Sequence, residues 1–184
     1  MKIWICSDTH FNHFNIIKYC NRPYATIKEM NDALIKNWND CVDDNDIVFF
    51  LGDFCFARPS EAFEVTKRLT SALKGYKVIV KGNHDFKKLK YTDIGWKFET
   101  FQELGIGRFC FRHRPDGPDT LQSAAKMYDF VFYGHVHDKT LDWAPINCIN
   151  VCLDANNFKP MDITDYFTDG EIGTIKRLVD YRGD

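Results

Sequence analysis

The sequence has no long apolar run, no excess of positive charge and no low-complexity segment. No apolar run approaches the roughly 18 residues that a membrane-spanning helix needs, and the opening MKIWICSDTH lacks the apolar stretch of a secretory signal. We therefore expect a cytoplasmic protein that makes no contact with a membrane. The net charge of −2 provides no broad basic field, so extended binding of nucleic acid is not expected either.

The seven cysteines form an odd set without a CxxC pair, which argues against a disulfide framework and a paired zinc motif. Most lie in apolar runs, so we expect reduced thiols packed as small hydrophobic side chains. Cys148 and Cys152 lie in INCINVCLD. On a strand they would share one face about 13 Å apart, too far to bind one ion.

Length and composition indicate a soluble globular chain. At 184 residues the chain suits a single domain, 1–184, with a substantial core. Its 45% apolar and 27% charged residues are ordinary for such a domain and exclude disorder over the whole chain. Nothing in the sequence indicates the oligomeric state.

The first half alternates apolar runs with amphipathic segments, which predicts parallel βαβ units of an α/β fold. We expect strands at 2–6, 46–53 and 77–85 and helices at 26–42 and 59–73. Thr26 and Glu29 form a capping box for the first of these helices.

The second half has shorter apolar runs and predicts a second sheet. We expect a pair of strands within 97–113 about the Gly105–Gly107 turn, a short helix at 121–127 and strands at 128–135 and 147–154. The tail, 173–184, is consistent with a last strand or with a frayed end.

Metal-binding side chains gather where the strand-like runs end. The stretches are SDTH at 7–10, FFLGDF at 49–54, GNHD at 82–85, FCFRH at 109–113 and GHVH at 134–137. In open α/β sheets, ligands bind at the carboxyl ends of strands. Histidine nitrogen with aspartate oxygen suits Mn, Fe, Zn or Ni better than Ca or Mg alone.

Two features would bring these side chains together. Strand alternation would point Asp8 and His10 the same way, and also His135 and His137. Glycines such as Gly52 and Gly82 would permit the tight turns by which the chain leaves each strand.

In chain order, DTH, GDF, GNHD, RHRP and GHVH resemble the five signature blocks of the calcineurin-like metallophosphoesterases. The blocks extend from residue 8 to residue 137, and SDTHFNHFNIIKYCNRPY at 7–24 is similar to the small bacterial and phage branch. The resemblance implies a two-layer β-sandwich flanked by helices, four layers in the order αββα, with a dinuclear metal centre at the strand ends.

The same resemblance implies a role for each matching residue. One metal would be held by Asp8, His10, Asp53 and His137, and the other by Asp53, Asn83, His113 and His135. Asp53 would bridge the two ions and His84 would be the catalytic histidine that protonates the leaving group. The expected ions are two divalent metals, Mn first, with Fe, Zn, Ni or Co as alternatives.

Two arginines lie where this sequence departs from the family pattern. Many members carry an arginine four residues after the aspartate that matches Asp53, whereas Arg58 lies five residues on, which puts its role as a phosphate clamp in doubt. Arg114, in HRP, takes the place of a tyrosine of the small branch. It either meets the substrate phosphate or is an exposed arginine at a strand end.

The remaining candidates for substrate contact lie near the first block. His13 and Asn15 either line the cleft or form a polar cluster at a helix start, and Arg22 is a further cleft candidate. Asp85 either orients His84 or caps the following turn.

The expected function is that of a metal-dependent phosphoesterase. It would hydrolyse a phosphate ester, in first place a small nucleotide-like phosphodiester, with a hydroxide shared between the two metals. A nuclease is an alternative because relatives cut polynucleotides, although the small size and weak basic character argue against it. A non-catalytic binding scaffold is the other alternative, and the full ligand set with His84 argues against that.

Overall fold

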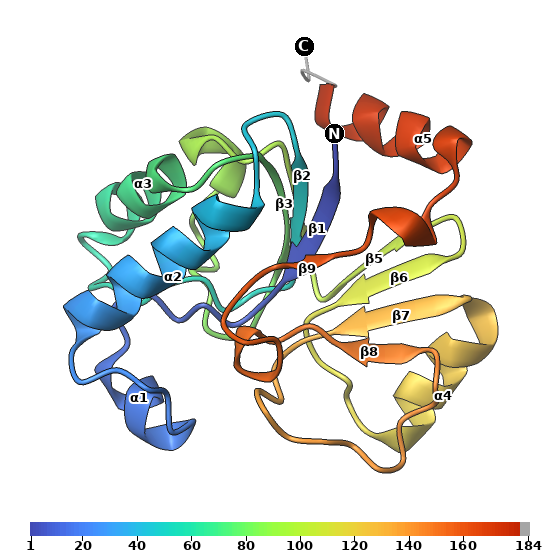
Figure 1. Cartoon of the computed structure of the whole chain (residues 1–184), viewed down its shortest axis with the longest axis horizontal. Helices are drawn as coiled ribbons and strands as arrows, with labels where there is room; N and C mark the ends of the chain where they lie inside the picture. The colour runs from blue at the N-terminus through green and yellow to red at the C-terminus, as the bar shows by residue number, and fades with distance from the viewer. Residues whose placement is uncertain (181–184) are drawn as a thin grey trace.

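Two β-sheets pack against each other between helices in the computed structural model, which describes residues 1–180 apart from the side chain at 178. Figure 1 shows α2 and α3 on one side of the molecule and α4 on the other, with the sheets between them. The expected αββα arrangement is confirmed.

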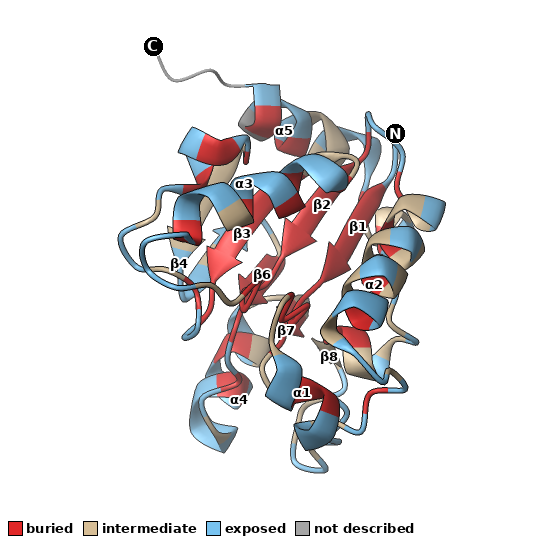
Figure 2. Cartoon of the chain, turned by 90° about the vertical axis from the view of Figure 1, so that its left-hand side faces the viewer, coloured by how far each residue is buried: buried red, intermediate tan, exposed pale blue. Residues whose placement is uncertain are grey.

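The first sheet has the strand order β4-β3-β2-β1-β9. Four of its strands run parallel and β9 runs antiparallel to β1. The strands are β1 (Ile3–Cys6), β2 (Ile47–Phe50), β3 (Tyr76–Lys81), β4 (Phe98–Phe101) and β9 (Met161–Asp162). Every residue of β1 and β2 is buried, because helices cover one face and the second sheet covers the other, as Figure 2 shows for the helical side.

Helices α2 (Ile27–Cys41) and α3 (Ala62–Ala72) cover the outer face of this sheet. One half of the predicted capping box is present, because the Thr26 hydroxyl accepts the Glu29 N–H at 3.1 Å; the Glu29 carboxylate accepts the N–H of Ala25, the residue before the cap, at 2.8 Å. The helix therefore begins where its sequence indicates.

The second sheet has the order β5-β6-β7-β8. An antiparallel hairpin of β5 and β6 leads into parallel pairs of β6 with β7 and of β7 with β8. The strands are β5 (Glu103–Ile106), β6 (Phe109–Arg112), β7 (Phe130–Tyr133) and β8 (Cys148–Asn150). Helix α4 (Pro118–Met127) packs Leu121 and Ala124 on its outer face.

The core between the sheets combines aliphatic side chains with stacked phenylalanines. Phe49 of the first sheet stacks on Phe111 of the second, with ring centroids 4.3 Å apart and planes 9° apart. Ile175 and Val179 of α5 (Asp169–Asp180) join this core. The remaining elements are α1 (Phe14–Tyr19) and the 3₁₀ turns η1 (Tyr91–Ile94), η2 (Leu153–Ala155) and η3 (Thr164–Tyr166).

Two expectations about the second half were wrong. The segment 98–101 joins the first sheet beside β3, and the strand pair about the glycine turn is the shorter hairpin 103–112. The tail is neither strand nor frayed end up to residue 180, because α5 buries Ile175 and Val179 at a helical spacing of four. Residues 181–184 lie outside the described part of the chain.

The cysteines agree with the expectation of unpaired thiols. All seven thiols are free, and Cys6, Cys55, Cys110 and Cys152 are buried. Among the described helices, none combines the length and the apolar character that crossing a membrane requires.

Candidate metal centre

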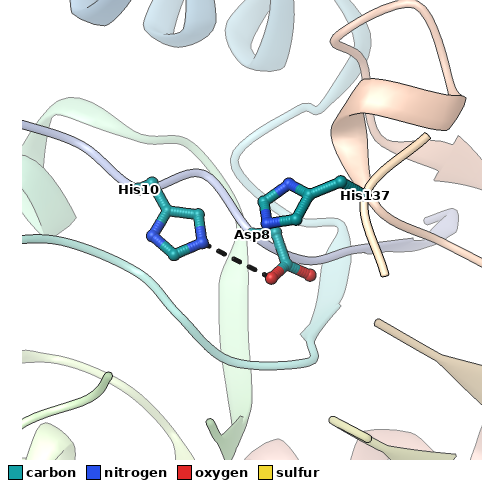
Figure 3. Close-up of side chains that lie close together, drawn as sticks. All are labelled: Asp8, His10 and His137. Atoms are coloured by element: carbon teal, nitrogen blue, oxygen red, sulfur yellow. Dashed lines mark ion pairs between the residues drawn. The ribbon is translucent and has the colours of Figure 1, made fainter. Parts of the chain in front are cut away.

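Two groups of three side chains meet at the carboxyl ends of the strands. The first group is Asp8, His10 and His137, and the second is Asp53, His113 and His135. Within each group the candidate ligand atoms lie within 4.8 Å of one another. Figure 3 shows the first group, with Asp8 and His10 on one segment and His137 approaching from another.

Asp53 belongs to the second group and also faces the first. Its Oδ2 atom is 3.7 Å from Nε2 of His10 and 3.4 Å from Nε2 of His113. In addition, Oδ1 of Asn83 is 3.0 Å from Nε2 of His113. The structure thus brings together all seven residues that the sequence indicated as metal ligands.

Each carboxylate has one oxygen anchored by the protein and one oxygen turned toward histidines. Oδ2 of Asp8 accepts the His135 N–H at 2.9 Å and the Cys152 thiol at 3.2 Å, and Oδ1 of Asp53 accepts the His84 N–H at 2.9 Å. The other oxygens, Oδ1 of Asp8 and Oδ2 of Asp53, face His10. One oxygen of each side chain is therefore available to a cation.

Five of these residues have left-handed backbone conformations. The φ angles are 61° at Asp8, 48° at His10, 60° at Asp53, 72° at His135 and 55° at His137. Non-glycine residues rarely adopt such angles, and they cluster at functional sites when the fold enforces them. The expectation that strand alternation orients these pairs was therefore wrong: tight turns after the strands bring the side chains together.

A side chain would not fit at either glycine, and Gly52 in addition has a turn conformation. Gly52 has a φ of 86°, which agrees with the expected turn. At Gly82, a Cβ atom would lie 2.3 Å from Oδ1 of Asp53. Gly82 is needed because the chain passes directly beside the central carboxylate.

The buried polar atoms of the first group fit a cation. Oδ1 of Asp8 and Nε2 of His10 are buried and have no hydrogen-bond partner within residues 1–180. Buried polar atoms without partners are costly, and a bound cation would satisfy both of these. The donor set of histidine nitrogens and carboxylate oxygens suits a first-row transition metal.

Charge within the site shifts the pKa values of its residues. Burial lowers the pKa of His113, but the hydrogen bond to Asp53 and the charge of Asp8 outweigh it and raise the pKa to about 9. For His137, burial is outweighed by hydrogen bonds to Asp154 and Cys20, which raise the pKa to about 10. Burial would raise the pKa of Asp8, yet the neighbouring histidines, His10 first among them, hold it below its ordinary value. His113 and His137 therefore hold a proton more tightly than free histidine does, and Asp8 holds one less tightly than free aspartate.

His84 stands beside the ligand groups and belongs to neither of them. It is exposed, and its ring lies 5.7 Å from the His10 ring and 5.4 Å from the Phe56 ring, centroid to centroid. Together with His10, Asp53, His135 and His137 it lines a cavity of about 290 Å³.

His13 also lines this cavity. Its ring stacks on Phe56 with centroids 3.9 Å apart, and burial together with the charge of His10 lowers its pKa to about 4. Asn15 is exposed on α1, and Arg58 is exposed before α3.

Arg114 is exposed and its Nε atom lies 3.4 Å from the Asp116 carboxylate. It lines a second cavity, of about 190 Å³, together with Asn83, Phe101 and His113. This places Arg114 beside two of the candidate ligands, Asn83 and His113.

The expectation that Arg22 lines the substrate cleft was wrong. The Arg22 side chain has no exposed surface. Its guanidinium donates to the Asp154 carboxylate and to the backbone carbonyls of Asp8 and Thr9. These contacts occupy the donors from within the protein, so Arg22 supports the ligands from beneath.

The role of Asp85 also differs from both alternatives considered for it. Its carboxylate accepts the N–H groups of Asp53, Phe54 and Gly82 and the Tyr91 hydroxyl. Asp85 therefore fixes the backbone that carries the central ligand Asp53, and it neither caps the next turn nor orients His84.

Sequence reasoning missed Asp154. Its Oδ2 atom lies 2.8 Å from Nδ1 of His137. A signal was present, because Asp154 follows the strand-like run INCINVC in the way that Asp53 follows its own run.

Comparison with known proteins identifies the family. The model of the calcineurin-like phosphoesterase superfamily domain matches residues 1–151, so the chain belongs to this superfamily. An uncharacterized protein of Methanocaldococcus jannaschii is 40% identical over 167 residues, which cover 88% of this chain and 87% of that protein.

Two solved structures are also similar. A protein of unknown function from Aquifex aeolicus has a TM-score of 0.68 and 24% identity, over 95% of this chain and 98% of its own. The nuclease MPE of Pseudomonas putida has a TM-score of 0.44 and 20% identity, over 73% of this chain and 60% of its own. The first of these likenesses supports the fold.

Proposed function

We propose that this protein is a metal-dependent phosphoesterase that hydrolyses a small, nucleotide-like phosphodiester. The observation that carries the proposal is the pair of histidine–aspartate groups about Asp53, at the base of a cavity that exposes His84. Two divalent ions suit these groups, with Mn as the first choice and Fe, Zn, Ni or Co as alternatives.

Asp8, His10, Asp53 and His137 would hold one ion, and Asp53, Asn83, His113 and His135 the other. The distances of 3.7 and 3.4 Å from Oδ2 of Asp53 to the two histidines support a shared carboxylate oxygen. When bound, such ions lower the pKa of a coordinated water and offset charge on a phosphate.

His84 would donate a proton to the leaving oxygen. A proton donor must lie beside the reacting atoms and keep its ring nitrogens free of metal. Two observations support this role for His84: its backbone N–H donates to Asp53, and its exposed ring lines the cavity.

Two cavities support a diester as the substrate. One, of about 290 Å³, is lined by His84 and His135, and the other, of about 190 Å³, by Asn83 and His113. A phosphate held by the central ligands would then have two neighbouring cavities for its ester groups, because each cavity is lined by some of these ligands. In the smaller cavity, the half-exposed Phe101 ring and Arg114 provide an apolar contact and a positive charge.

A panel of substrates tests the proposal. Metal-free protein should be inactive, and Mn should restore hydrolysis of bis-p-nitrophenyl phosphate in preference to p-nitrophenyl phosphate. Undiminished turnover after chelation, with metal content checked by elemental analysis, would contradict the metal mechanism. Higher kcat/KM for oligonucleotides than for small diesters would favour a nuclease, and metal binding without hydrolysis of any ester would favour a scaffold.

Substitution of Phe101 tests the second cavity. Phe101→Ala should raise KM for the diester several-fold and leave the monoester unchanged, because only the diester has a second ester group. Phe63→Ala, which removes a similarly exposed ring from α3, should change neither. Equal effects of Phe101→Ala on both substrates would contradict the assignment of this cavity.

A further inference from the structure

A buried ion pair lies beneath the first ligand group. The Arg22 guanidinium makes two hydrogen bonds to the Asp154 carboxylate. Its Nε donates to Oδ1 and its Nη2 donates to Oδ2, each at 2.8 Å. The side chains of Arg22 and Asp154 are 0% and 2% exposed. Burial of charge is costly unless it is fully paired, so a pair in this place calls for an explanation.

Asp154 contacts a candidate ligand directly. Its Oδ2 atom is 2.8 Å from Nδ1 of His137, while the other ring nitrogen of His137 remains for the group with Asp8 and His10. A carboxylate in this position fixes the tautomer and the orientation of a metal-binding histidine and increases its basicity.

Arg22 holds the other segment of the same group. Its two Nη atoms donate to the backbone carbonyls of Asp8 and Thr9 at 2.7 and 2.8 Å. These carbonyls lie in the turn where Asp8 and His10 have left-handed backbone angles. One guanidinium therefore links the two segments that carry the first ligand group.

We propose that Asp154 and Arg22 are positioning residues that hold the ligands of the first metal site, Asp8, His10 and His137, in place. Asp154 keeps the proton of His137 on Nδ1 and leaves Nε2 to the ion, and Arg22 holds Asp154 and the Asp8–Thr9 backbone in place. Within residues 1–180, neither side chain has a hydrogen bond to Asp53, His113 or His135 of the second group. This inference rests on the proposed metal centre.

A different assignment would make Asp154 a ligand itself. Cys20, His137 and Asp154 also have potential ligand atoms within 4.8 Å of one another. However, Arg22 already occupies both oxygens of Asp154, and its positive charge in a buried site repels a second cation. We therefore assign Asp154 to support of His137 and not to a third metal site.

Equilibrium dialysis against Mn²⁺ tests the proposal through metal content. Asp154→Asn should weaken one ion about 10- to 100-fold and leave the other unchanged, so that one ion per chain remains at limiting Mn²⁺. Arg22→Lys, which keeps the charge and loses the planar fork, should act in the same direction. Asp142→Asn changes the charge equally at an exposed position and should retain both ions.

Spectroscopy of the unaltered protein gives a second measurement that needs no variant to fold. In ¹⁵N-labelled protein loaded with ¹¹³Cd, Nε2 of His137 should couple to the metal and Nδ1 should carry a proton. Coupling through Nδ1, a ¹¹³Cd shift typical of a thiolate ligand, or a third bound ion would overturn the proposal.

The outcomes separate this inference from the function on which it rests. If wild-type protein binds no metal, the proposed metal centre fails and this inference fails with it. If wild type and Asp154→Asn bind two ions with equal affinity, this inference alone is overturned.

Discussion

The two ligand groups are similar in composition and different in how they are held. In the second group, Nδ1 of His113 lies 2.7 Å from the backbone carbonyl of Leu51. In the first, Nδ1 of His137 lies 2.8 Å from the Asp154 carboxylate. One histidine is oriented by the backbone of a central strand end, and the other by a side chain that is itself paired with Arg22.

This difference predicts how each half of the centre responds to change. The Leu51 backbone carbonyl that orients His113 cannot be removed by substitution. A carboxylate can be removed by a single substitution. We therefore expect the second site to tolerate changes nearby, and the first to depend on residues distant in the sequence.

The largest effect should come from Asp53→Asn, because Asp53 is shared by both groups. The substitution removes a charge that both ions would use, so metal content should fall below one ion per chain and activity to that of chelated wild type. Elemental analysis and hydrolysis of bis-p-nitrophenyl phosphate measure the two effects. Retention of two ions with near-native activity would show that Asp53 is not the bridge, and Asp142→Asn is again the matched control.

A change outside both groups should separate chemistry from metal binding. His84→Ala should keep both ions and lower the rate about 10²- to 10⁴-fold, the usual effect of a placed proton donor. The loss should be smaller for p-nitrophenolate, which needs little protonation as it leaves, than for an alkoxide leaving from a dialkyl diester. His135→Ala and His137→Ala should instead lower metal content. Equal activity of wild type and His84→Ala on both substrates would remove the acid role.

The contrast between the groups also explains what the sequence could predict. The seven candidate ligands follow strand-like apolar runs, and parallel strands bring their carboxyl ends together, so their meeting was predictable. The Arg22–Asp154 pair was not, because it joins residues 132 apart through the packing of loops. The left-handed turns at Asp8 and His10 were missed for a similar reason: tertiary contacts impose them against the local preference.

Helix α5 was missed although its signal is local. Thr168 and Glu171 have the spacing of a capping box, and the Thr168 N–H donates to the Glu171 carboxylate at 2.8 Å. The apolar positions Ile172, Ile175 and Val179 follow at helical spacing. The capping residues and the apolar spacing together are therefore sufficient to predict this helix from the sequence.

The stability of metal-free protein should depend on pH, because each ligand group contains a histidine with a raised pKa. The pKa values of His113 and His137 are raised from 6.5 to about 9 and about 10 in the folded protein. The folded state therefore keeps protons that the unfolded state loses above pH 6.5, and stability should fall as pH rises from 6.5 through 9 to 10. Thermal unfolding with and without Mn²⁺ measures this. The decline should be absent from metal-loaded protein, and an equal decline in both forms would contradict the assignment.

The smallest effect concerns Lys77, whose titration opposes that of the histidines at high pH. Lys77 is buried in β3, and burial lowers its pKa to about 8. Because the folded pKa is depressed, the unfolded state binds more protons between pH 8 and 10.5, so this group makes stability rise over that range. Lys77→Met should therefore stabilise the protein at pH 7 by about 1 kcal/mol and have little effect above pH 10.5. In metal-free protein it should also make stability fall more steeply between pH 8 and pH 10. Lys87→Met, at an exposed position, is the control for loss of one charge. A gain from Lys77→Met that is the same at pH 7 and pH 11 would show that it comes from apolar packing and not from relief of a buried charge.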